Sequence, residues 1–154
     1  MNGIVEQHKQ FKGSISEARG ASGGIATMWN HSIWNCNSET INHHWIKTVL
    51  ENKEDKKTVI IYNIYVPNHY RDKDCCWRDL KSNIDEEGSS NIILGGDLNL
   101  ILHANEKRGG SFISDPYRIH LENIMQEYEL MDIVPKNRRY TWSNRRIGTG
   151  NIME

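Results

Sequence analysis

The stretch that decides the fold is Asn91-Ile-Ile-Leu-Gly-Gly-Asp-Leu-Asn99. Its first part, residues 91–94, is an apolar run between a serine pair and a glycine pair, which predicts a strand buried on both faces. Two short polar side chains, Asp97 and Asn99, follow the glycines. If strand geometry continues, alternation at period two places both on one side and turns Leu98 into the core. The stretch predicts a buried strand with polar groups at its carboxyl end.

Asp97 and Asn99 are a useful pair for hydrolysis of a phosphodiester. The carboxylate can orient a water, take its proton or hold a divalent cation, and the amide can donate to a non-bridging phosphate oxygen. The glycines allow backbone or substrate to come close. Gly, Asp and Asn are also the commonest turn formers, so these five residues alone favour a simple turn.

The segments before this stretch predict a hairpin and a helix. Residues 45–50 and 58–65 are rich in strand formers and flank the turn-rich residues 51–57. After the break at residues 66–68, Asp74 is placed to cap a helix. The apolar positions of that helix recur at helical spacing: Cys76, Trp77, Leu80 and Ile84.

Tyr65 is a second candidate site residue, because it ends a predicted strand beside a loop. A phenol there can hydrogen bond a phosphate oxygen or support a leaving oxygen, whereas Tyr62 faces the other side of the sheet. A tyrosine in this place is more often a residue that packs on a sheet, so both interpretations stay open.

The remaining segments complete the order of elements. Residues 1–20 are polar enough to form only a short strand or an adaptable arm, and residues 22–29 predict a strand. Asp115 and Pro116 stand at the N-cap and first position of a second helix, and residues 139–143 predict a final strand. This order predicts the α+β class, with a mixed sheet and helices on its outer face.

Composition limits the functional classes. The 154 residues carry 19 Lys+Arg against 20 Asp+Glu, a net charge of -1, so the chain is not a basic coat for nucleic acid. No window has the roughly 18 apolar residues that a membrane helix requires. Three cysteines, two of them adjacent, favour a reducing compartment, and no protein partner is evident.

Taken together, Asn63-Ile-Tyr-Val-Pro-Asn68 and residues 92–99 resemble the endonuclease/exonuclease/phosphatase superfamily, the DNase I-like fold. Residues 21–30, 106–110 and 139–146 resemble the endonuclease domain of plant LINE-type non-LTR retrotransposons. The similarity begins near Ala21, which sets residues 1–20 apart as an arm and leaves 21–154 as an incomplete domain. The implied fold is part of a four-layer α/β/β/α sandwich with mixed sheets and outer helices.

The resemblance also implies roles for individual residues. Tyr65 acts at the phosphate and Asn68 contacts substrate, while Asp97 activates water and Asn99 orients the phosphate. Asp97 and Asn99 then lie close to a Mg²⁺ (or Mn²⁺) ion. Trp142 packs beneath the nucleic-acid face, although a core tryptophan is at least as common.

The chain departs from the family pattern at both ends. Relatives carry an upstream glutamate that is the principal magnesium ligand, and neither Glu6 nor Glu17 has the strand context of that residue. Relatives also continue to a histidine that contacts the scissile phosphate, whereas Glu154 is the last residue here. The resemblance therefore predicts a domain truncated at both ends, with an exposed apolar edge.

Two groups of basic residues are candidates for contact with a phosphate backbone. No acidic residue interrupts the larger group, which lies between Pro135 and Gly150. Such a group either tracks nucleic acid or forms a solvated surface, and the sequence leaves both open. The two groups are Lys136, Arg138, Arg139, Arg145 and Arg146, and the smaller pair Lys107 and Arg108.

These features predict a fragment of a Mg²⁺-dependent phosphodiesterase that nicks DNA, which would place it in the nucleus; the sequence itself carries no address. One alternative is a non-catalytic transposon remnant with at most weak affinity for nucleic acid. Another is a phosphatase or lipid phosphodiesterase of the same superfamily, because a fold does not choose a substrate.

Overall fold

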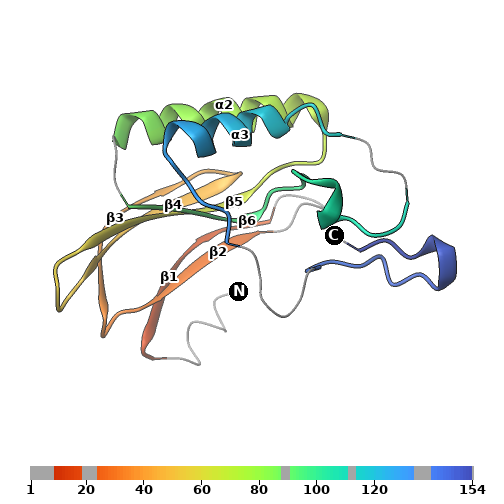
Figure 1. Ribbon diagram of the computed structural model, residues 1–154. Helices are drawn as coiled ribbons and strands as arrows, with labels where there is room; N and C mark the ends of the chain where they lie inside the picture. Colours follow the sequence, from red (N-terminus) through yellow and green to blue (C-terminus); the bar gives the residue numbers. More distant parts are fainter. Residues whose placement is uncertain (1–8, 19–23, 88–90, 111–113, 134–139, 154) are drawn as a thin grey trace. The chain divides into compact units, whose positions relative to one another are not determined.

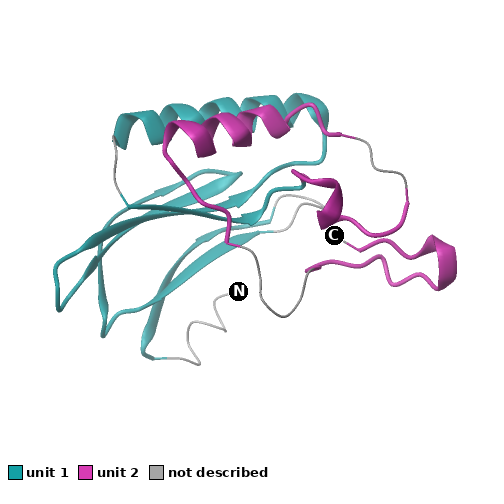
Figure 2. Cartoon of the chain, in the orientation of Figure 1, with its two compact units in different colours: residues 1–99 teal, residues 100–154 magenta. Residues whose placement is uncertain are grey.

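The computed structural model describes residues 9–18, 24–87, 91–110, 114–133 and 140–153. The chain divides into two compact units, residues 1–99 and residues 100–154 (Figure 2). Each unit has its own secondary structure and is described by itself.

The described residues of unit 1 hold two sheets and one long helix (Figure 1). Strands β1 and β2 form an antiparallel pair, and the other sheet has the order β3-β4-β5-β6. Its first three strands are antiparallel, and β5 pairs with β6 in parallel, so the sheet is mixed and the α+β class is confirmed. The elements are β1 (Phe11–Ser16), β2 (Ile25–Asn30), β3 (Trp34–Ile41), β4 (Trp45–Asn52), β5 (Thr58–Tyr65), α2 (Tyr70–Glu87) and β6 (Ile92–Asp97).

Helix α2 covers one face of the four-stranded sheet (Figure 1). The Tyr62 hydroxyl donates to Asn83 Oδ1 at 3.0 Å, and Trp45 Nε1 donates to Asp79 Oδ2 at 3.0 Å. Alternate side chains of β5 are buried on this face, as the period-two pattern requires. They are Ile60, Tyr62 and Ile64. The predicted stripe of α2 is buried as well: Cys76, Trp77, Leu80 and Ile84.

The opposite face of this sheet meets β1 and β2. Asn63 Nδ2 donates to Ala26 O at 2.9 Å and to Thr27 Oγ1 at 3.2 Å, and so connects the two sheets. Asn63 pairs in register with Ile46, so the β4 residues on this inner face are Ile46, Thr48 and Leu50, all of them buried. Unit 1 therefore has three layers: a helix, a four-stranded sheet and a two-stranded sheet.

Two predictions for unit 1 need correction, and one strand was not predicted. Helix α2 begins at Tyr70, so Asp74 lies inside it and pairs with Arg78 at 2.8 Å instead of capping it. Strand β3 was not predicted, because its polar residues lie at a sheet edge, where burial places no demand on them. Strand β6 is the other edge of the described sheet, so Ile93 is 48% exposed and the strand is not buried on both faces.

The N-terminal stretch and the hairpin follow prediction. Strand β1 shows that the described part of residues 1–20 includes a short strand, while the division into an arm and a domain stays a prediction. The hairpin forms as expected. Strands β4 and β5 are paired from Trp45 opposite Ile64 to Glu51 opposite Thr58.

No helix in the described ranges is long and apolar enough to cross a membrane. The three cysteines are free thiols.

Unit 2 contains α3 (Arg118–Glu127) and two short 3-10 helices, η1 (Ala104–Glu106) and η2 (Gly148–Gly150). Helix α3 begins two residues after the predicted first position, Pro116, because Asp115 accepts the Tyr117 N–H at 2.9 Å and closes a turn first. The predicted strand at 139–143 is not formed over its described part. Ser143 makes only an isolated bridge with Met153, and Arg139 lies outside the described residues.

Candidate functional site

Tyr65 and Asp97 are paired in register at the carboxyl ends of β5 and β6. Both strands end here, and the chain enters a loop from each. Ligands of open α/β sheets bind in the crevice at the carboxyl ends of parallel strands, so this is the natural place for chemistry. The Tyr65 side chain is half-buried and that of Asp97 is exposed to solvent.

The neighbouring hairpin holds the backbone of Tyr65. Its N–H donates to the His44 carbonyl at 2.7 Å, and His44 N donates to Asn42 Oδ1 at 3.1 Å. Partial burial lowers the pKa of His44, and the adjacent His43 lowers it further. His44 supports Tyr65 through its backbone carbonyl.

Gly96 allows β6 to run against β5 just before Asp97. Its φ is +131°, and a Cβ at this position would lie 2.0 Å from the Ile64 carbonyl oxygen. A side chain does not fit at that distance. Gly95 is different, because a Cβ there would meet nothing within 4 Å. The expected close approach of backbone is therefore confirmed for the second glycine of the pair.

Asn99 is not a strand residue, which corrects the predicted alternation. Strand β6 ends at Asp97, and Asn99 has a φ of +45°, in the left-handed region that Asn tolerates better than most residues. The Asn99 N–H donates to Asp97 Oδ1 at 3.1 Å, and Nδ2 donates to the Val66 carbonyl at 2.6 Å. Asp97 and Asn99 are brought together by an Asx-type turn, and Leu98 is half-buried.

The loops after β5 and β6 are joined through the Val66 backbone. Its N–H donates to the Asp97 carbonyl at 2.8 Å, and its carbonyl accepts the Asn99 amide. Val66 itself is fully buried. Asn68, the predicted substrate contact, is exposed two residues later on this loop. The structure therefore gathers Tyr65, Asn68, Asp97 and Asn99 around two connected strand ends.

Lys73 is a site residue that the sequence analysis missed. It lies in the first turn of α2, is 6% exposed, and donates from Nζ to the Asn99 carbonyl at 2.8 Å. The signal was present, because residue 73 falls three and four positions before Cys76 and Trp77 on the buried stripe. A lysine on an apolar stripe is buried only with polar partners.

The site offers carboxylate and amide oxygens, which are the ligand types that a hard cation such as Mg²⁺ prefers. Only two side chains supply them. Mg²⁺ binds through one or two carboxylates and keeps several waters. Asp97 supplies one exposed carboxylate, of which Oδ1 accepts the Asn99 N–H, and Asn99 supplies an amide oxygen. Across the described ranges, no three His, Cys, Asp or Glu side chains are grouped to hold a metal ion. Asp97 and Asn99 thus offer two side-chain oxygen groups of the kind that a hard cation binds.

The other predicted contacts lie in unit 2. Arg108 forms an isolated bridge with Met153, and Met153 also bridges Ser143, so Met153 lies between Arg108 and the segment that carries Trp142 and Arg145. Trp142 is 53% exposed, and both arginines are exposed. Trp142 is thus a surface residue and not a core tryptophan. Lys136, Arg138 and Arg139 lie outside the described residues.

Asn144 organises that segment and was also missed. Its Nδ2 donates to the Gly150 carbonyl at 2.9 Å, and its Oδ1 accepts the N–H groups of Arg146 and Ile152 at 3.1 and 3.0 Å. An Asn followed by two arginines gives no periodic signal, so only tertiary structure identifies this role. The basic residues project from a loop with a fixed backbone.

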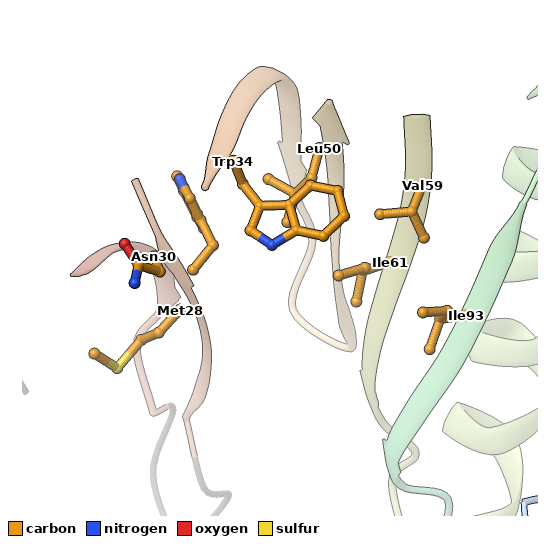
Figure 3. Close-up of a pocket in the computed structure, with 8 residues that line it drawn as sticks. Met28, Asn30, Trp34, Leu50, Val59, Ile61 and Ile93 are labelled. Atoms are coloured by element: carbon orange, nitrogen blue, oxygen red, sulfur yellow. The ribbon is translucent and has the colours of Figure 1, made fainter. Parts of the chain in front are cut away.

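A second feature of unit 1 is an apolar cavity of about 330 Å³ between its two sheets (Figure 3). Ile61 lines it and precedes Tyr65 by four residues, a separation of about 13 Å along a strand. The cavity therefore lies away from Asp97 and takes no part in the site. Its lining is Met28, Trp29, Asn30, Trp34, Leu50, Val59, Ile61 and Ile93.

Comparisons with known proteins give a likeness to solved structures. No family model matches the chain, and no curated protein matches it. Among solved structures, the chain is similar to the human Nocturnin catalytic domain with bound sulfate anion, at a TM-score of 0.45 and 13% sequence identity. The match covers 64% of this chain and 46% of that chain, so this protein spans less than half the length of the domain that it resembles.

Proposed function

We propose that this chain is part of a Mg²⁺-dependent phosphodiesterase of the endonuclease/exonuclease/phosphatase superfamily, similar to the DNA-nicking domains of LINE-type retrotransposons. The observation that carries the proposal is the register pairing of Tyr65 with Asp97, with Asn99 bonded to the same carboxylate. This arrangement places a phenol, a carboxylate and an amide at one pair of strand ends. A carboxylate can act as a general base in phosphodiester hydrolysis, and a phenol and an amide can donate hydrogen bonds to phosphate oxygens.

Each side chain has a distinct task in this proposal. The exposed Asp97 carboxylate accepts a proton from the attacking water through the oxygen that Asn99 N–H does not occupy. Tyr65 donates its O–H to a phosphate oxygen. The Asn99 amide has two N–H bonds, so its contact with Val66 leaves one bond direction for a phosphate oxygen.

Magnesium (or manganese) is the proposed cofactor, held by Asp97 and Asn99 with water in the other positions. When bound, it would offset negative charge on the phosphate. DNA is the proposed substrate, with Asn68, Arg108, Trp142 and Arg145 as contacts. Exposed arginines suit the phosphate backbone, and an exposed tryptophan suits a base or sugar face.

Nicking of supercoiled plasmid by the 154-residue chain in the presence of Mg²⁺ tests the proposal. Asp97→Asn keeps the shape of the side chain but removes the base, so we expect loss of at least about 100-fold in rate. Asp85→Asn is the matched control, because Asp85 pairs with Lys81 at 2.9 Å on helix α2. Equal nicking by wild type and Asp97→Asn would overturn the assignment.

A second candidate function is nucleic-acid binding without cleavage. The small number of possible metal ligands favours this function. Among the described residues, Asp97 is the one carboxylate at these strand ends, and no three His, Cys, Asp or Glu side chains are grouped to hold a metal ion. Binding of labelled DNA with steep salt dependence, together with a folded chain that never nicks, would select this function over the first.

A further inference from the structure

Lys73 has a physical environment that is unfavourable for a lysine. Its side chain is buried, and burial of an ammonium group is costly without polar partners. It also lies in the first turn of α2, where the helix dipole repels positive charge. The other lysine that is buried on this side of the sheet, Lys47, pairs with the carboxylate of Glu87. One of the polar partners of Lys73 is a backbone carbonyl, that of Asn99.

The bonded groups form a continuous path from Lys73 to the candidate base. Nζ holds the Asn99 carbonyl at 2.8 Å, and the Asn99 N–H holds Asp97 Oδ1 at 3.1 Å. Asn99 has a left-handed backbone, a conformation that Asn tolerates better than most residues and that its hydrogen bonds hold here. Lys73 and Val66 fix Asn99 from two sides, by its carbonyl and by its side-chain amide.

We propose that Lys73 is a positioning residue for the phosphodiester site. Its ammonium holds Asn99 in the left-handed conformation, and Asn99 in turn aims the Asp97 carboxylate. This proposal rests on the proposed function, because the turn between Asp97 and Asn99 matters for catalysis only if Asp97 is the general base. It assigns Lys73 no contact with substrate.

Three lysine variants separate positioning from general stability. Lys73→Met keeps the length and apolar body of the side chain and removes both the charge and the hydrogen bond to the Asn99 carbonyl. Lys73→Arg keeps a charged donor. Lys81→Met, on the same helix, removes a lysine that pairs with Asp85 at 2.9 Å and serves as the control.

The first readout is amide hydrogen exchange, which needs no activity. We expect Lys73→Met to speed exchange at the Asn99 N–H by at least about tenfold, with no change at Ile61 in the middle of β5. Lys73→Arg and Lys81→Met should leave both amides as in wild type. Unchanged exchange at Asn99 overturns the proposal, and so does faster exchange at Ile61 as well, since that marks a structural role alone.

The second readout is plasmid nicking. We expect Lys73→Met to lower kcat by roughly 100-fold with KM nearly unchanged, because a displaced base loses rate and not binding. Lys73→Arg should restore most of kcat. If wild type does not nick, the proposed function fails, while faster exchange at Asn99 still supports Lys73 as the residue that holds this turn. Equal kcat for Lys73→Met and wild type overturns the positioning role.

Discussion

Tyr65 and Asp97 are direct neighbours across the parallel pair β5 and β6, each the last residue of its strand. The two residues are 32 positions apart in the sequence, and the crossover through α2 between the two parallel strands brings them together. The two loops that follow are joined by hydrogen bonds through Val66. A phenol and a carboxylate therefore share one rigid edge of the sheet.

Tyr65→Phe removes only the phenolic oxygen from this edge. We expect nicking to fall by at least about tenfold, because a hydrogen bond to a charged oxygen is lost, with little change in the free energy of unfolding. Tyr62→Phe is the matched control. Its hydroxyl bonds Asn83 on α2, so we expect a loss of stability of about 1 kcal/mol and full activity. The reverse pattern would show that Tyr65 is a packing residue.

The glycine pair before Asp97 offers a sharp test of backbone geometry. Gly96→Ala should lower the free energy of unfolding by more than about 2 kcal/mol, since its Cβ would meet the Ile64 carbonyl and its φ is positive. Gly95→Ala should change that free energy by no more than about 0.5 kcal/mol, because the position is open. Urea denaturation followed by circular dichroism measures both. Equal losses would contradict the close approach at Gly96.

Thr48 is fully buried on the inner face of β4, and its hydroxyl has no hydrogen-bond partner within the described part of the chain. Thr48→Val replaces that hydroxyl with a methyl group of similar shape. We expect the free energy of unfolding to stay the same or rise by up to about 1 kcal/mol.

Thr27→Val is the comparison for this prediction. Its Oγ1 accepts the Asn63 amide across the two sheets at 3.2 Å, so the same substitution should cost about 1 kcal/mol there. The urea midpoints of the two variants, each compared with that of the wild type, measure these changes in stability. A loss of stability in Thr48→Val as large as that in Thr27→Val would mean that the Thr48 hydroxyl is bonded after all.

The adjacent cysteines should differ in reactivity. Cys75 is exposed, whereas burial, with smaller contributions from Asp79 and Cys75, raises the pKa of Cys76 to about 12. The thiolate is the reactive form, so the native Cys76 thiol should resist iodoacetamide from about pH 7 to 9 while Cys75 is alkylated.

Tandem mass spectrometry of the alkylated peptide distinguishes the two sites. In urea both thiols should react at similar rates, because the burial that raises the pKa of Cys76 is gone. Equal labelling of Cys75 and Cys76 in the folded protein would contradict the buried stripe of α2.

Local patterns of the sequence were sufficient for most elements of unit 1. The hairpin of β4 and β5 followed from strand formers around a turn, and the stripe of α2 from spacing at 3.6 residues. Boundaries were less well predicted. Helix α2 starts four residues before Asp74 because the His69 carbonyl accepts the Lys73 N–H at 3.0 Å, a contact that composition does not encode.

The sequence alone therefore determined which side chains are the candidates for the proposed chemistry, Tyr65, Asp97 and Asn99, because strand ends and turn formers are local features. Only the tertiary structure decided how they meet. Parallel pairing set Tyr65 beside Asp97, and the left-handed turn at Asn99 replaced the predicted alternation. Lys73 closes this turn from a different element. These contacts join residues that are distant in sequence. The packing of the whole sheet brings those residues together, and no single segment specifies it.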